Sequence, residues 1–114
     1  MPKKLSVQLV TWNGEKYIPH LFDSLKNQSF DDWKLNILDN DSKDKTVKLI
    51  EQELQDFDTD YEFKKSDENL GFAVGHNQIY QDTESEYVLL LNQDMYLEPD
   101  CLENLVKFIV FQIL

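Results

Sequence analysis

The chain has 114 residues, enough for one domain, and its 41% hydrophobic and 12% aromatic residues suffice for a packed core. Its formal net charge of -11 repels phosphate backbones and anionic lipid surfaces, which argues against nucleic acid as a partner. The sequence shows no signal-peptide pattern and no run of the roughly 20 apolar residues that span a membrane. A single cysteine, Cys101, excludes an internal disulfide, so a cytoplasmic location is expected.

Hydrophobic periodicity divides the chain into alternating strands and helices. Alternation of this kind is typical of βαβ units. We therefore expect a single α/β domain over residues 1–114, with a mostly parallel sheet and helices on both faces. The strands are expected at residues 5–11, 33–38, 61–65 and 87–91, and the helices at about 17–25, 44–54, 72–81 and from 99 onward.

The strand expected at residues 87–91 is apolar throughout and ends abruptly at Asn92, Gln93 and Asp94. A run of this kind predicts a strand buried on both faces of a parallel sheet. Open α/β sheets bind ligands beyond the carboxyl ends of their strands. Asp94 is thus placed to hold a divalent cation, Mg²⁺ or Mn²⁺, against a phosphate. A simple polar turn is the alternative interpretation, since Asn and Asp favour turns.

Polar or aromatic residues also lie at the exits of the first two strands, namely Thr11, Trp12 and Asn13 at one exit and Asp39 at the other. The flat face of Trp12 can stack on a base, and core packing is its alternative role. The Asp39 carboxylate can accept a hydrogen bond from the imide N–H of uracil or thymine, which favours those bases over cytosine. Its alternative is a solvated turn residue.

The third strand is followed by a loop that contains Asn69 and Gly71. Gly71 permits close backbone approach or a positive φ, whereas Asn69 is equally suited to cap the next helix. Asn77 falls on that helix, and we expect it to face the same cleft. Its neighbour His76 is interpreted as a surface or packing histidine.

The last helix is apolar nearly all round, and such a helix is normally buried. We therefore expect it to be covered by a partner, by a second copy of the chain or by further residues of a larger domain. Its expected core stripe is Leu102, Leu105, Val106, Ile109, Val110 and Ile113, and the apolar residues off that stripe are Phe108, Phe111 and Leu114.

Four segments, in order, resemble one family. The chain is similar to the N-terminal half of an inverting family 2 glycosyltransferase with a GT-A fold, closest to its rhamnosyltransferase-like branch. The resemblance extends to about Lys107. The matching segments are residues 7–14 (VQLVTWNG), 37–44 (ILDNDSKD), 69–73 (NLGFA) and 89–94 (LLLNQD) with 97–100 (LEPD).

The resemblance implies a site for a nucleoside-diphosphate sugar. Asp39 stands at the position that binds the pyrimidine, and Trp12 replaces the Tyr that usually packs on it. Asn92 lies at the ribose position, and Asp94 is the last residue of the DxD motif that meets the metal on the diphosphate. The implied reaction transfers a sugar to the hydroxyl of an acceptor glycan or lipid-linked sugar, in the cytoplasm or at the membrane periphery. The remaining expected site residues are Thr11, Asn13, Asn69, Gly71 and Asn77.

Two departures from the family pattern bear on activity. Asn92 replaces the first Asp of the motif, and Gln93 stands where this branch often has Pro. The family's second half, with the acceptor site and the catalytic base, is missing, so we expect a truncated donor-binding part without turnover of its own. A non-enzymatic α/β module that binds a nucleotide or a partner chain is the rival interpretation. A receiver-like domain ranks last, because Asn13 and Gly14 follow the first strand in place of an acidic pair.

Overall fold

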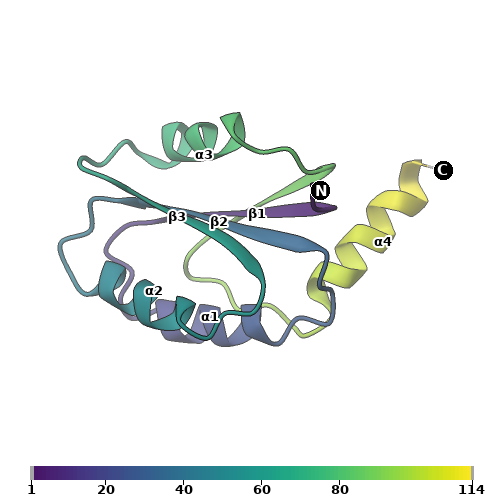
Figure 1. Ribbon diagram of the computed structural model, residues 1–114, viewed down its shortest axis with the longest axis horizontal. Coiled ribbons are helices and arrows are strands. Elements are labelled where there is room, and N and C mark those ends of the chain that lie inside the picture. Colours follow the sequence, from purple (N-terminus) through teal and green to yellow (C-terminus); the bar gives the residue numbers. More distant parts are fainter. Residues whose placement is uncertain (1, 114) are drawn as a thin grey trace.

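The computed structural model describes residues 2–113, with side chains described up to residue 110. Four strands form one sheet in the order β3-β2-β1-β4, and every neighbouring pair is parallel. Helices α1 and α2 cover one face, α3 covers the other, and α4 projects from one end of the sheet (Figure 1). The expected α/β fold is therefore confirmed. The elements are β1 (Leu5–Thr11), α1 (Ile18–Lys26), β2 (Trp33–Asn40), α2 (Thr46–Leu54), β3 (Asp60–Ser66), α3 (Phe72–Gln81), β4 (Tyr87–Leu91) and α4 (Cys101–Ile113).

The register of the strands brings their carboxyl ends together. Thr11, the last residue of β1, pairs with Asp39 of β2. On the other side of β1, the pairing with β4 ends at Leu9 and Leu91. The residues that follow Leu91 therefore run beside the last residues of β1 rather than beyond them.

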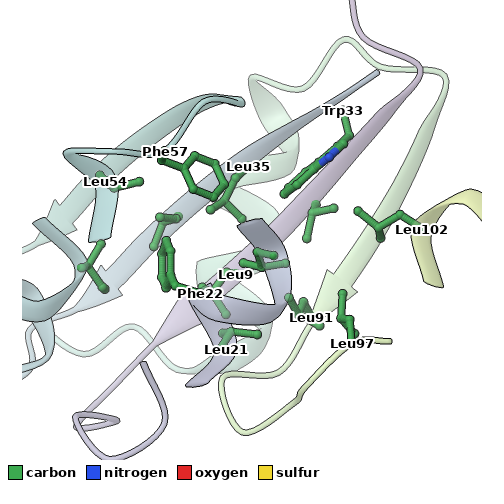
Figure 2. Packing of buried hydrophobic residues seen from close by; sticks show 14 of the residues in the cluster. Leu9, Leu21, Phe22, Trp33, Leu35, Leu54, Phe57, Leu91, Leu97 and Leu102 are labelled. Carbon is green, nitrogen blue, oxygen red and sulfur yellow. The ribbon is translucent and has the colours of Figure 1, made fainter. Parts of the chain in front are cut away.

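The hydrophobic core lies between the sheet and the helices α1 and α2. Alternate residues of a strand point to opposite faces, and the residues of β1 that point to this side are Leu5, Val7 and Leu9, each at most 3% exposed. Figure 2 shows Leu9 of β1 and Leu35 of β2 in the same cluster as Phe22 of α1 and Phe57 of the α2–β3 loop. Other members of the cluster are Ile18, Leu21, Leu25, Trp33, Leu35, Ile37, Ile50, Leu54, Leu91, Leu97, Leu102 and Val106.

The expectation that β4 is buried on both faces was wrong. β4 is an edge strand, and its Leu90 side chain is 52% exposed. Helix α3 lies over β1 and β2, so it does not cover the Leu90 side of β4. An apolar run cannot by itself distinguish a central strand from an edge strand whose second face is left open.

Helix α4 contacts the core through fewer residues than expected. Leu102 and Val106 are buried, but Leu105, expected in the same stripe, is 37% exposed, and Phe108 is 62% exposed. Ile109 and Val110 are partly buried. The side chains of Phe111, Ile113 and Leu114 lie outside the described residues. Within residues 2–113 no helix is long and apolar enough to cross a membrane.

Candidate functional site

A cleft of about 490 Å³ opens at the carboxyl edge of the sheet, above the ends of β1, β2 and β4. Six of the nine residues predicted from the sequence line it: Thr11, Trp12, Asn69, Gly71, Asn92 and Asp94. The remaining lining residues are Val10, Tyr17, Asn40, Phe72 and Gln93. The strand exits thus converge on one open hollow that is lined by both polar and apolar side chains.

Trp12 stands at the wall of this cleft with its side chain 49% exposed. Because Trp12 is half exposed, core packing does not account for this residue. An exposed aromatic face at a strand exit can stack on a flat ligand group.

The β1–α1 loop is held in place by the loop that follows β2. The Asn13 amide donates to the Ser42 hydroxyl at 2.9 Å, and the Asn13 Oδ1 accepts from the Lys43 amide at 2.9 Å. The Gly14 amide donates to Thr46 Oγ1 at 2.8 Å. Asn13, whose φ is 45°, therefore connects the two loops through its hydrogen bonds. It does not belong to the lining of the cleft.

Asp39 is 1% exposed and lies behind the cleft wall. Its Oδ1 accepts hydrogen bonds from the hydroxyls of Thr11 and Ser42, each at 2.7 Å, and its Oδ2 accepts from the Ser42 amide at 2.9 Å. The structure thus gives this carboxylate the role of joining the exits of β1 and β2. A carboxylate has about four acceptor positions, so contact with a base through Oδ2 stays a prediction.

Asp44 forms a further connection between the β1–α1 loop and the start of α2. Partial burial alone would raise the pKa of its carboxyl group. Hydrogen bonds from the hydroxyl and amide of Thr46 and from the Glu15 amide outweigh this effect and hold the pKa below its usual value. The charged form of Asp44 therefore links the start of α2 to the β1–α1 loop.

The loop before α3 forms the far wall of the cleft. Gly71 has a φ of 83°, in the left-handed region that glycine adopts without strain. Its amide is bound by Asn69 Oδ1 at 2.9 Å. Asn40, the last residue of β2, donates through Nδ2 to the Gly71 carbonyl at 3.1 Å and accepts from the Leu70 amide at 3.2 Å. Asn40 was missed in the sequence, although its place next to Asp39 at a strand exit was a usable signal.

Asn77 does not face this cleft, so the sequence-based expectation was wrong. It lines a separate hollow together with Leu38 and Lys64, on the side of α3 that faces β3. Only the first turn of α3, at Phe72, reaches the cleft. Asn77 lies more than one helical turn further along the chain, where the helix has moved away from the strand exits.

The acidic side of the cleft is a turn that follows β4. The Met95 amide donates to the Asn92 carbonyl at 3.3 Å, which closes the turn. Asn92 and Asp94 are exposed on it, while Gln93 is half-buried. Gln93 is bound to both backbone groups of Trp12: it accepts from the Trp12 amide at 3.0 Å and donates to the Trp12 carbonyl at 3.0 Å.

The donor set of the cleft suits a divalent cation only in part. Residues 2–113 contain no group of three or more His, Cys, Asp or Glu side chains arranged to hold a metal ion. Asp94 is the one carboxylate on the cleft lining. Mg²⁺ is commonly bound through one or two carboxylates, with phosphate oxygens and water completing its shell. The residues therefore fit a cation that arrives with a phosphate ligand, and not a cation held by the protein alone.

The cleft lies beyond the carboxyl ends of the strands, where open parallel α/β sheets bind their ligands. The model of the family described as Glycosyl transferase family 2 matches residues 6–112, and the chain belongs to this family. The chain is 32% identical over 91 residues to a teichoic acid poly(glycerol phosphate) polymerase of Staphylococcus epidermidis, a match that covers 80% of the chain. It is 28% identical over 108 residues to the poly(ribitol-phosphate) beta-N-acetylglucosaminyltransferase TarS of Staphylococcus aureus, a match that covers 93% of the chain. The chain spans 13% of the length of the first relative and 19% of the second.

Solved structures agree with this assignment. The crystal structure of S. aureus TarS 1-349 in complex with UDP-GlcNAc matches with a TM-score of 0.85 and 28% identity, over 95% of this chain and 31% of that chain. The mannosyltransferase PcManGT from Pyrobaculum calidifontis, in complex with GDP-Man and Mn²⁺, matches with a TM-score of 0.88 over 96% of this chain and 33% of that chain. At 20% identity the second likeness shows the shared GT-A fold alone.

Proposed function

We propose that this chain is the donor-binding part of a glycosyltransferase that uses a UDP- or dTDP-sugar. The observation that carries the proposal is the convergence of Trp12, Asn92 and Asp94 on one cleft at the carboxyl edge of the sheet. The relative TarS, 28% identical to this chain, has been crystallised with UDP and with UDP-GlcNAc. In this proposal the sugar passes to an acceptor hydroxyl of a cell-surface glycan or lipid-linked sugar. The proposed location is the cytoplasm or the membrane periphery.

Each wall of the cleft has a proposed role in holding the nucleotide. The pyrimidine stacks on Trp12, and its imide N–H is bound at the Thr11–Asp39 pair. The ribose lies near Asn92. Asn69 and Gly71 close the opposite wall, where a glycine lets the ligand approach the backbone. Assignment to the rhamnosyltransferase-like branch stays a prediction from the motifs.

Asp94 is proposed to hold Mg²⁺ or Mn²⁺ on the diphosphate. The cation supplies the positive charge that a chain of net charge -11 lacks for binding a diphosphate. Asp94 is exposed and forms no ion pair with the described residues, so its carboxylate is free to coordinate. In this proposal the protein contributes the Asp94 carboxylate and the aromatic face of Trp12, which lie in one cleft.

Isothermal titration calorimetry tests this proposal directly. We expect UDP to bind in the presence of Mn²⁺ and to bind far more weakly without it. Asp94→Ala should weaken binding by at least about tenfold, because metal affinity depends strongly on the groups that hold the ion. Asp58→Ala, an exposed aspartate between α2 and β3, is the matched control and should bind as the wild type does. Equal affinity with and without metal, or an unaffected Asp94→Ala variant, contradicts the role of Asp94.

We further propose that the 114 residues bind the donor without completing transfer. An inverting transfer needs a base within hydrogen-bond reach of the acceptor hydroxyl. In this proposal the base and the acceptor site belong to residues other than these 114. We expect that this chain does not detectably transfer the sugar of UDP-GlcNAc to an acceptor polymer. Robust donor-dependent transfer by the chain alone contradicts the proposal.

The exposed side of α4 is proposed to be covered by a second copy or another chain. Leu105 and Phe108 line an apolar hollow of about 560 Å³ together with Met95 and Tyr96. Exposed apolar patches of this kind commonly mark interaction surfaces. Sedimentation at micromolar concentration should show association that Phe108→Glu abolishes, with Lys107→Glu as a control on the exposed side of the same helix. A monomer whose behaviour ignores Phe108→Glu contradicts this part of the proposal.

A further inference from the structure

Gln93 joins the acidic turn to the backbone of Trp12 through two hydrogen bonds. The Trp12 amide donates to Gln93 Oε1 at 3.0 Å, and Gln93 Nε2 donates to the Trp12 carbonyl at 3.0 Å. A side-chain amide that meets both backbone groups of one residue reproduces the pairing that a neighbouring strand would make. The ladder between β1 and β4 ends at Leu9 and Leu91. The Gln93 contact therefore extends the connection between these two strand ends into the cleft.

Gly14 provides the space for this contact. A Cβ atom on Gly14 would lie 2.4 Å from Gln93 Oε1 and 2.6 Å from Gln93 Cδ. Among the described glycines only Gly71 has a positive φ, so the backbone conformation of Gly14 does not call for a glycine. The absence of a side chain at Gly14 is thus explained by the Gln93 amide that occupies its place.

No other hydrogen bond within the described part of the chain joins residues 92–95 to residues 12–17. Trp12 is 49% exposed at the cleft, and Asp94 is exposed on the turn. The pairing of β1 with β4 brings the two segments to the same edge of the sheet, and within the described residues Gln93 supplies the hydrogen bonds that tie the turn to Trp12 there.

We infer that Gln93 is a positioning residue that sets Asp94 and Trp12 at the separation needed to hold the two ends of one nucleoside diphosphate. This inference rests on the proposed function, in which Trp12 stacks on the base and Asp94 meets the metal-bound diphosphate. Gln93 lines the same cleft, but both polar atoms of its amide are bound to the Trp12 backbone, so its proposed role is to position its neighbours. Its amide is neutral, so it ties the turn down without adding charge beside Asp94.

The test combines a contact readout with a binding readout on the 114-residue chain. Gln93→Ala should speed hydrogen exchange at the Trp12 amide, measured by NMR, and should weaken UDP binding in the presence of Mn²⁺ by about tenfold, a loss typical of outer positioning groups. Gly14→Ala should do the same, because its methyl group displaces the Gln93 amide. The double variant should bind no more weakly than Gln93→Ala alone, since both changes act through one contact. Gln52→Ala on the exposed side of α2 is the matched control and should leave both readouts unchanged.

The possible outcomes separate this inference from the proposed function. If the wild-type chain does not bind UDP with Mn²⁺, the proposed function falls and the inference falls with it. If the wild type binds and Gln93→Ala binds equally well, only the positioning role is overturned. Additive losses in the double variant also overturn it, because they show that Gly14 and Gln93 act separately. Circular dichroism checks the fold of each variant, and Gln93→Met, which keeps the side-chain length, replaces Gln93→Ala if the latter unfolds.

Discussion

The two faces of the sheet are built from opposite kinds of side chain. On the side of α1 and α2, β1 presents Leu5, Val7 and Leu9, and the core is closed and apolar. On the side of α3, the same strand presents Ser6 and Gln8, which are equally buried but polar. The α3 side still buries Leu38 of β2 and Ile79 of α3, so strand alternation separates a wholly apolar face from a mixed face with buried polar groups.

The polar face is incompletely satisfied. His76 of α3 is 4% exposed, and its Nδ1 lies 3.3 Å from Gln8 Oε1. Its Nε2 has no partner among the described residues, and neither does Oδ1 of the buried Asn36. Burying a polar atom without a hydrogen bond costs free energy. We therefore expect α3, whose first turn lines the cleft, to be held more weakly than α1.

The largest expected effect is on the apolar face. Phe22→Ala should lower the free energy of unfolding by about 3–5 kcal/mol, because the fully buried ring packs against Phe57 and its loss leaves a cavity. Urea unfolding followed by circular dichroism measures the change. Phe72→Ala on α3 makes the same substitution at a ring that is 56% exposed, and it should cost less than about 1 kcal/mol. Comparable losses for the two variants would show that the faces do not differ as described.

A smaller effect is expected on the polar face. Gln8→Ala should cost about 1–3 kcal/mol, because it leaves the Nδ1 of the buried His76 without its partner. The two contacts it removes are long, at 3.3 Å to His76 and 3.5 Å to the Thr83 hydroxyl. Urea unfolding again measures the change. A loss as large as that of Phe22→Ala would mean that the polar layer is a main source of stability.

The smallest effect is a pH dependence that comes from His76. Burial lowers the pKa of its imidazole below the usual 6.5. The unfolded chain then binds a proton more readily than the folded chain, so folding favours neutral His76. Stability should be constant above about pH 6.5 and should fall as the pH drops from there through the lowered pKa of the folded state.

Urea midpoints at pH 7.5 and 6.0 for the wild type and for His76→Leu isolate this contribution. The exposed His20 is present in both proteins and cancels in the comparison. The wild type should lose more stability than the variant between the two pH values. An equal loss of stability in both proteins would contradict a pH-dependent contribution of His76.

The elements themselves were predictable because each rests on local pattern. The bounds of β1, α3 and β4 agree with those expected from the sequence, and β2 and β3 are longer by one or two residues at their ends. Apolar residues at helical or alternating spacing specify which side of an element can be buried. The edge position of β4 was not predictable, because the place of an apolar strand in a sheet depends on how all the strands pair, and its own sequence does not show this.

The cleft could be predicted only in outline. Residues at the carboxyl ends of parallel strands share one edge of the sheet, and the cleft lining at that edge includes Thr11, Trp12, Asn92 and Asp94. Asn77 was misplaced because its direction depends on the rotation of α3 about its axis. Gln93 was read only as a departure from a motif, because its two bonds to Trp12 join residues that are 81 positions apart.

The sequence by itself determined the order of strands and helices, the parallel α/β class and the family, because periodicity and motifs are local properties of the chain. The tertiary structure alone decided which face of the sheet is apolar and closed, which carboxylate is buried and which is exposed, and which strand lies at the edge. Asp39 and Asp94 illustrate the difference. Both follow or end a strand at the same edge, yet Asp39 is 1% exposed and bound by Thr11 and Ser42, whereas Asp94 is exposed at the cleft. The physical reason is that burial and hydrogen-bond partners depend on groups distant in sequence, which only the folded chain brings into contact.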